Sequence, residues 1–351
     1  MKIKIGLPQG IYEKGKRDNQ EDALYPTVGK GTTDEKVFIL CDGMGGHEHG
    51  EVASGIVSTT MAAYLSAHWP EDGRVEDSLV KAAVEEAFEA LDAKDDGAAK
   101  KMGTTLAMVV LHEGGCMAVH IGDSRIYHLR TSERRLLFRS RDHSLVTDLY
   151  QAGEISYEEM RTSPQKNIIT KAMQPGEDNR VQPDIVHIGN LRTGDYLFLC
   201  SDGMMEQMDD SQLIDILCSK DSDAEKRWQL MEASADNSDN HSAHLIHIDE
   251  VMMDENEIVV DDEGTTRSNF LNIHPNVVDA VEVDVQPKET ESQSSTTPLL
   301  AKNSHKWLWL LLAAIAAAGF FIWMSLADGD DDKGNQENST QQQIEMKPIR
   351  R

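Results

Sequence analysis

The sequence predicts an α+β domain over residues 1–250, and three features indicate that class. Short continuous apolar runs, the pattern of strands buried on both faces, recur at residues 37–40 (VFIL), 117–121 (MAVHI) and 196–199 (YLFL). Two other stretches carry apolar side chains at helical spacing. A Gly-Gly turn joins two adjacent apolar runs, which is typical of an antiparallel β-hairpin.

The predicted elements follow one another closely along this domain. The first helix has its apolar residues at Val52, Ile56, Val57, Met61, Tyr64 and Leu65, and the second at Leu79, Val80, Val84, Phe88 and Leu91. The hairpin pairs residues 106–111 (LAMVVL) with residues 116–121 (CMAVHI). The last strand of the domain is expected at residues 244–248 (HLIHI).

Each of the three apolar runs stops at an aspartate beside a glycine, namely Asp42, Asp123 and Asp202. A single Asp-Gly pair is most often a turn, so the repeated placement is the informative part. If the strands lie side by side, the aspartates converge at one sheet end, where their charges repel unless cations neutralise them. Oxygen ligands favour Mg²⁺ or Mn²⁺. The pattern therefore predicts a metal centre built from aspartates, without His or Cys ligands.

The composition of the chain indicates which binding partners are unfavourable and in which cellular compartment the protein is expected. The chain has 351 residues and a formal net charge of -27, which argues against nonspecific binding to nucleic acid. None of its 4 cysteines forms a CxxC pair, so they are expected to be small core side chains in a reducing compartment. The first ten residues, MKIKIGLPQG, lack the apolar core of a secretory signal peptide.

The amino-acid composition of the sequence changes after residue 250. Residues 251–306 form an acidic, Ser/Thr-rich stretch that is typical of a linker. Residues 307–327 contain no charged side chain and are long enough to cross about 30 Å of hydrocarbon. Lys302 and Lys306 precede them, which predicts a cytoplasmic N-terminal side. We expect a single-pass helix in the inner (cytoplasmic) membrane, a cytoplasmic catalytic domain, and a polar outer tail at residues 328–351.

Eight motifs in order resemble the series found in metal-dependent protein phosphatases of the type 2C family, in its bacterial branch. They are RDNQEDA, CDGMGGHEHGEVAS, GTTLAMVVL, IGDSRIYHLR, RDHSLVTDLYQAGEIS, NIITKAM, GDYLFLCSDGMME and DNHSAHLIHI. The resemblance covers residues 5–250 and is specific, because it is a whole series and not one short pattern. It implies a four-layer α-β-β-α sandwich of two antiparallel sheets flanked by helices, with a two-metal centre in a cleft at one end.

The resemblance also implies the activity, the ions and the residues that serve them. It implies hydrolysis of phosphoserine and phosphothreonine in proteins by a metal-activated water, with two Mn²⁺ or Mg²⁺ ions and often a third, weaker one. Matched motif by motif, it assigns metal-ligand roles as follows: Asp42 bridging both ions, the carbonyl of Gly43 on one ion, Asp202 and Asp239 on the other, Glu21 and Asp22 completing the first, and Asp123 on the third.

Other positions receive roles from the same resemblance. Arg17 matches the arginine that binds the phosphate, although an arginine in such a polar stretch is usually a solvated surface residue. Met44 stands where eukaryotic relatives carry a histidine proposed as general acid, so the proton donor is left open. His143 is expected to bond a loop carbonyl, and residues 149–170 are expected to form a flap segment beside the site.

Two other classes of protein compete with the phosphatase interpretation. A phosphoprotein-binding pseudophosphatase is the alternative, and the intact acidic set with Arg17 argues against it. A two-metal nuclease would need basic or aromatic stripes, which this acidic chain lacks. The expected partners are phosphoserine and phosphothreonine proteins, and a serine/threonine kinase in a neighbouring gene would indicate the opposing enzyme.

Overall fold

A computed structural model describes residues 1–45, 49–95, 97, 101–176 and 179–252, together with the strands at 258–260 and 266–268. The chain divides into two units, Met1–Glu282 and Val283–Arg351, and all described residues lie in the first. The predicted linker, membrane helix and tail therefore fall mostly or wholly outside the described residues. Among the helices that are described, none is long and apolar enough to span a bilayer.

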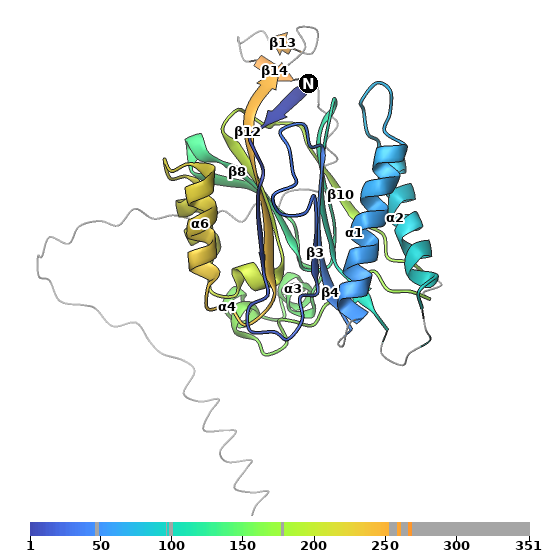
Figure 1. Ribbon diagram of the computed structural model, residues 1–351. Helices are drawn as coiled ribbons and strands as arrows, with labels where there is room; N and C mark the ends of the chain where they lie inside the picture. The colour runs from blue at the N-terminus through green and yellow to red at the C-terminus, as the bar shows by residue number, and fades with distance from the viewer. Residues whose placement is uncertain are drawn as a thin grey trace, which may run out of the picture. The chain divides into compact units, whose positions relative to one another are not determined.

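Two six-stranded sheets, antiparallel throughout, form the centre of the molecule (Figure 1). The first has the order β10-β7-β6-β4-β3, with β5 paired to β4: Asp184–Ile188, Gly115–Ile121, Leu106–His112, Val37–Met44, Asp22–Tyr25 and Gly103–Thr104. The second has the order β1-β12-β11-β8-β9, with β2 paired to β12: Lys2–Ile5, His241–Met252, Asp195–Cys200, Arg125–Arg130, Arg135–Arg139 and Gln9–Glu13. Strands β13 (Ile258–Val260) and β14 (Thr266–Ser268) pair separately.

Helices cover the outer faces of both sheets. α1 (His49–Ala67) and α2 (Asp77–Asp92) lie on the first sheet, whereas α5 (Asp210–Leu217) and α6 (Asp223–Ser234) lie on the second (Figure 1). The remaining helical elements are the 3-10 turns η1 (Thr131–Glu133) and η2 (Asp202–Met205) and the short helices α3 (Leu145–Gln151) and α4 (Tyr157–Thr162). Apolar side chains fill three interfaces, so the predicted four-layer sandwich is confirmed.

The continuous apolar runs are explained by the double burial of their strands. In β4, Ile39 and Cys41 face the core under α1 and α2, whereas Phe38 and Leu40 face the core between the sheets. Successive side chains of a strand point to opposite faces. A strand with a core on each side is therefore apolar at every position and does not alternate between apolar and polar residues. The β6–β7 hairpin, with His112 opposite Gly115, is likewise confirmed.

Two strands are longer than the apolar runs that predicted them. β4 continues through Asp42 to Met44, because Gly43 and Met44 pair with β5. β12 begins three residues before the predicted run and extends beyond it, because β1, β2 and β11 all pair with it. The polar residues at the ends of both strands are therefore held in the strand by pairing with neighbouring strands. The local sequence does not encode this pairing.

The three strands that end near aspartates do not lie side by side in one sheet, and the prediction of a single sheet end was wrong in that respect. β4 and β7 belong to the first sheet with β6 between them, whereas β11 belongs to the second. The aspartates that follow or end these strands instead meet between the two sheets at one end of the sandwich.

Candidate metal centre

Asp22 and Asp42 face each other across neighbouring strands of the first sheet. β3 and β4 are antiparallel, and their register places Asp22 directly opposite Asp42. Residues so opposed have Cβ atoms about 4.5–5.5 Å apart and project from the same face of the sheet. Two carboxylates at this separation repel strongly unless a cation or protons lie between them.

The backbone N–H and carbonyl of Asp42 are both hydrogen-bonded to Thr104 and Thr105, at the junction of β5 and β6. Its N–H donates to Thr105 Oγ1 at 3.0 Å, and its carbonyl accepts from Thr104 Oγ1 at 2.9 Å and from the Thr105 N–H at 2.9 Å. The position of the main chain is thereby fixed, and the carboxylate of Asp42 is left for other contacts.

The second sheet reaches the same place through Ser201. Its hydroxyl donates to Asp22 Oδ2 at 3.1 Å and accepts from the Ser242 N–H at 3.0 Å. Asp202 follows Ser201 directly at the start of η2, and Asp239 lies just before β12. The Ser201 hydroxyl therefore joins Asp22 of the first sheet to the two segments of the second sheet that carry the other aspartates.

Glu21 and Gly43 meet the start of α1. The Gly43 N–H donates to the Glu21 carbonyl at 3.1 Å, and the Ser54 hydroxyl donates to the same carbonyl at 2.5 Å. A Cβ at Gly43 would lie 2.1 Å from the Gly50 carbonyl oxygen, so no larger residue fits without moving the backbone. Glycine at position 43 is thus required by the close approach of α1 and the Glu21 loop.

Asn240 holds the N-terminal loop against this centre, and the motif analysis did not single it out. Its Oδ1 accepts the Glu21 N–H at 2.8 Å, and its Nδ2 donates to the carbonyls of Lys14 and Asn19 at 2.8 and 2.9 Å. Between those anchors lies Arg17, whose Nη2 is 2.5 Å from Asp239 Oδ2. The Arg17 side chain is 56% exposed, so its guanidinium is accessible from solvent while it contacts the centre.

The electrostatics of the aspartates show that they form one group. The pKa of Asp22 is raised to about 7 and that of Asp123 to about 8, mainly by burial, and the charge of Asp202 contributes to both increases. Burial, followed by repulsion from Asp22 and Asp202, raises the pKa of Asp42 well above its usual range. Burial and then Asp239 raise the pKa of Asp202.

Two carboxylate oxygens of this group, Oδ1 of Asp22 and Oδ1 of Asp123, are buried and have no hydrogen-bond partner among the described residues. Buried polar atoms are ordinarily paired, so each such oxygen indicates a missing partner. The donors are all oxygens and the group accumulates negative charge, which fits Mg²⁺ or Mn²⁺. The residues present thus fit the metal ions that the sequence predicted.

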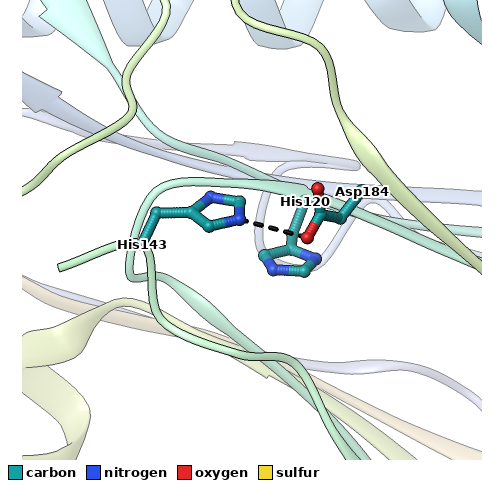
Figure 2. A group of neighbouring side chains, drawn as sticks. All are labelled: His120, His143 and Asp184. Atoms are coloured by element: carbon teal, nitrogen blue, oxygen red, sulfur yellow. Dashed lines mark hydrogen bonds and ion pairs between the residues drawn. The ribbon is translucent and has the colours of Figure 1, made fainter. Parts of the chain in front are cut away.

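A second cluster, His120, His143 and Asp184, also brings three possible ligand atoms within 4.8 Å of one another (Figure 2). Its hydrogen bonds, however, argue against a bound ion. His143 Nδ1 accepts the Gly122 N–H at 3.0 Å, so in the neutral ring Nε2 carries the proton and donates to Asp184 Oδ2 at 3.2 Å. A metal would need the Nε2 lone pair, and Lys171 Nζ already lies 3.5 Å from Asp184 Oδ1.

Comparison with known proteins decides the family. The family model of protein phosphatase 2C matches residues 14–245. The chain belongs to the protein phosphatase 2C family. It is a metal-dependent serine/threonine phosphatase, as the motif series predicted.

Individual proteins that are similar to this type 2C phosphatase support the same family assignment. It is 33% identical to protein phosphatase PhpP of Streptococcus pneumoniae, over 67% of this chain and 94% of that protein. The structure of the serine/threonine phosphatase PstP of Mycobacterium tuberculosis matches with a TM-score of 0.60 and 30% identity, over 71% of this chain and all of that one. A structure of the PstP catalytic domain in complex with 2 manganese ions matches with a TM-score of 0.59 and 29% identity, over 71% of this chain and 100% of that chain.

The structure of this type 2C phosphatase brings the predicted site residues to one end of the sandwich. Direct contacts or mutual electrostatic effects link Arg17, Glu21, Asp22, Asp42, Gly43, Asp123, Asp202 and Asp239. Asn240, Thr105 and Ser201 were missed, although each adjoins a motif aspartate or a motif threonine. Arg125 was also missed: it binds both carboxylate oxygens of Asp142, at 2.8 and 2.6 Å, and its charge lowers the pKa of Asp202 and Asp123.

Proposed function

We propose that this phosphatase hydrolyses phosphoserine and phosphothreonine in proteins at a centre that holds two Mn²⁺ or Mg²⁺ ions between the sheets. The observation that carries the proposal is the group of Asp22, Asp42, Asp123 and Asp202, whose pKa values all rise because burial and mutual repulsion oppose their ionisation. Such a group is poorly suited to stand alone at neutral pH and well suited to bind divalent cations.

The carboxylates form two sets, one carried by the first sheet and one by the second. Asp42, with the Gly43 carbonyl, Glu21 and Asp22, would hold ions from the side of the first sheet. Asp202 and Asp239 would hold them from the second, with Asp123 serving a third, weaker ion. When bound, the ions would supply a water of lowered pKa as the nucleophile and neutralise charge on the phosphate. The protein fixes these carboxylates through Thr104, Thr105, Ser201 and Asn240.

Arg17 is the proposed phosphate ligand. Its guanidinium contacts Asp239 and is more than half exposed, so it lies at the boundary between the carboxylates and solvent. The planar guanidinium can donate two parallel hydrogen bonds either to a phosphate or to a carboxylate. A phosphate entering from solvent would therefore meet Arg17 before it meets the carboxylates.

The substrate is proposed to be a phosphorylated protein, opposed by a cognate serine/threonine kinase. Residues 307–327 are proposed to anchor the chain in the inner membrane, with the catalytic domain in the cytoplasm. A pseudophosphatase that only binds phosphoproteins is less favoured, because binding alone would not require so many buried carboxylates.

The test is phosphate release from a phosphothreonine peptide by the full-length protein after removal of metal ions. Added Mn²⁺ or Mg²⁺ should restore turnover, chelator should abolish it, and a DNA substrate should remain intact. Asp42→Asn should be inactive with either ion, whereas Asp34→Asn, an exposed aspartate in a surface turn, should behave as wild type. Binding of the phosphopeptide without any turnover in the presence of both ions would support the pseudophosphatase instead.

A further inference from the structure

We propose that a cavity beside the loop of Arg17 binds a basic side chain of the phosphorylated protein, close to the residue that loses its phosphate. The inference rests on the proposed function and deepens it, because it names a property of the substrate. The cavity has a volume of about 340 Å³ and is lined by residues from β2 and the loop that follows it, from α6 and from the start of β12. This volume is at the lower end of the range for small-ligand pockets, about 300–1,000 Å³.

The cavity lies where the apolar interface between the second sheet and α6 comes to an end. Ile11 of β2 and Ala243 of β12 belong to that interface. Because successive residues of a strand alternate between its faces, Glu13 and His241 project from the same face as these two, and the register places them directly opposite each other. α6 ends at Ser234, and at this level the polar pair lines a cavity where a longer helix would have continued the core.

The buried part of the lining offers hydrogen-bond acceptors. Asn237 is 0% exposed, and its Nδ2 donates to the Gly203 carbonyl, so the other amide atom is the oxygen. This Oδ1 atom is buried and has no hydrogen-bond partner among the described residues, which indicates a missing donor. His241 is 3% exposed, and its Nδ1 lies 3.0 Å from the Asp239 carbonyl oxygen. In the neutral ring Nδ1 therefore donates and Nε2 is an acceptor.

The exposed part of the lining carries negative charge. Glu13 and Glu232 are exposed, and neither carboxylate forms a hydrogen bond or an ion pair with another residue that the structure describes. Lys16 brings a positive charge to the lining, but its Nζ donates to the Asp236 carbonyl at 2.8 Å. Two carboxylates and one ammonium leave the lining negative, with both carboxylates available to a ligand.

A lysine or arginine side chain fits this lining. Ammonium and guanidinium groups donate hydrogen bonds and accept none, which matches a cavity of acceptors. Met231 and Ala235 supply an apolar wall. Lysine and arginine pack their methylene groups against such surfaces while the charged end stays among polar groups. A phosphate would meet two carboxylates here, so the cavity selects a cation and not a second phosphate.

The cavity shares its walls with the proposed phosphate site. Gly15 has φ of +62°, and a Cβ there would lie 2.2 Å from the Asp239 carbonyl oxygen, so this loop packs directly on the segment that carries Asp239. The Lys16 N–H donates to the Ser238 carbonyl at 3.1 Å, and Arg17 follows with its contact to Asp239. Each residue of an extended substrate spans about 3.3–3.6 Å. A basic residue within a few positions of the phosphothreonine would therefore enter the cavity while the phosphate contacts Arg17.

The experiment measures kcat/KM of the full-length protein with Mn²⁺ on a series of phosphothreonine peptides. A single arginine is moved through the three positions on either side of the phosphothreonine in an otherwise alanine sequence, and an aryl phosphate serves as a substrate without side chains. Arginine at the position that reaches the cavity should raise kcat/KM over the alanine peptide by at least about fivefold, the upper end for one exposed ion pair. Glutamate at that position should lower it.

Variants of the two glutamates connect this preference to the cavity. Glu13→Gln and Glu232→Gln remove the charge and keep the shape of the side chain. Each should reduce the preference for arginine, and the double variant should abolish it, while turnover of the aryl phosphate stays as in wild type. Glu71→Gln, which changes an exposed glutamate between α1 and α2, is the matched control and should keep the full preference. Equal kcat/KM on all peptides in wild type, or a full preference in the double variant, would overturn the inference.

Agmatine, a free guanidinium compound, distinguishes a substrate side chain from a free cation. It should compete with the arginine peptide and leave turnover of the aryl phosphate unchanged. If agmatine binds through both glutamates but no peptide is preferred, the cavity serves a free cation and the substrate role is wrong.

Failure of the proposed function would give a different result. In that case neither the peptides nor the aryl phosphate would be hydrolysed with Mn²⁺ or Mg²⁺. Calorimetry with agmatine would then decide on the cavity alone. Binding by wild type that is lost in the double variant would support a cation site, and equal heats in both proteins would exclude it.

Discussion

The metal-free protein should become less stable as the pH rises, because it must ionise Asp22 in a buried carboxylate group. An ordinary aspartate has a pKa of about 4, and in the folded protein burial raises the pKa of Asp22 to about 7. Between these values the folded state binds the proton and the unfolded state does not, so folding stability is lost as the pH rises toward 7. The difference of about three pKa units between the unfolded and the folded state corresponds to about 4 kcal/mol of folding stability. A large part of this stability should be lost by pH 8.

Histidines impose the opposite trend, so the comparison must be made against a variant. Burial lowers the pKa of His120 and His244 to about 4, which stabilises the folded protein as the pH rises through 6.5. Asp22→Asn keeps an acceptor for the Ser201 hydroxyl and removes the titration of Asp22, while the histidines stay the same. The difference in unfolding free energy between the two proteins removes the contribution of the histidines and leaves that of Asp22 together with its repulsion of the neighbouring carboxylates.

The assay is urea denaturation in excess chelator at pH 5, 6, 7 and 8. Between pH 5 and pH 8, the unfolding free energy of Asp22→Asn should rise relative to that of wild type by a few kcal/mol. Asp18→Asn, which changes an exposed residue of the same loop, should show no such rise. Saturating Mn²⁺ should reverse the order at pH 8, because the ion stabilises the ionised group of wild type. Parallel curves for wild type and Asp22→Asn across the whole pH range would refute the reasoning.

Four further outcomes are expected. Arg17→Ala should weaken inhibition by inorganic phosphate by one to two powers of ten, from about 1.5–3 kcal/mol for a charged hydrogen bond, and Arg17→Lys should recover only part of it; an unchanged inhibition constant would remove Arg17 from phosphate binding. Asn240→Ala should lower the unfolding free energy by about 1–3 kcal/mol, because a backbone N–H and two carbonyls lose their partner; a smaller change would mean that water replaces the amide. Asp42→Asn and Asp202→Asn should each remove most turnover on an aryl phosphate, and wild-type rates in either would exclude that ligand. Truncation before Lys302 should leave aryl phosphate turnover unchanged but slow dephosphorylation of a membrane-bound phosphoprotein, and equal rates on both substrates would exclude a tethering role.

The sequence predicts the individual strands and helices well because they depend on local pattern, whereas the four-layer arrangement is what the resemblance of the motif series implies. The run at residues 37–40 is apolar at every position, and in the structure its side chains alternate between two cores. A residue-by-residue pattern does not say which sheet a strand joins, however. β4 and β11 look alike in sequence, and only long-range pairing places them in different sheets.

The parts of the site that the sequence missed are held by contacts between distant residues. The hydrogen bond from the Glu21 N–H to Asn240 joins residues 219 positions apart, and Ser201 and Asp22 are 179 apart. His143 illustrates the same limit, because it was expected to bond a loop carbonyl and instead accepts the Gly122 N–H through Nδ1. Which nitrogen of a histidine carries the proton depends on such partners, so it is set by the tertiary structure.

The most direct test of the central claim is an anomalous difference map from crystals of the protein soaked in Mn²⁺. We predict two strong peaks at the end of the sandwich, one between Asp42 and the Gly43 carbonyl and one between Asp42 and the pair Asp202 and Asp239, with a weaker peak at Asp123. No peak among these carboxylates, or a strong peak at His120, His143 and Asp184 in their place, would contradict a metal centre built from aspartates.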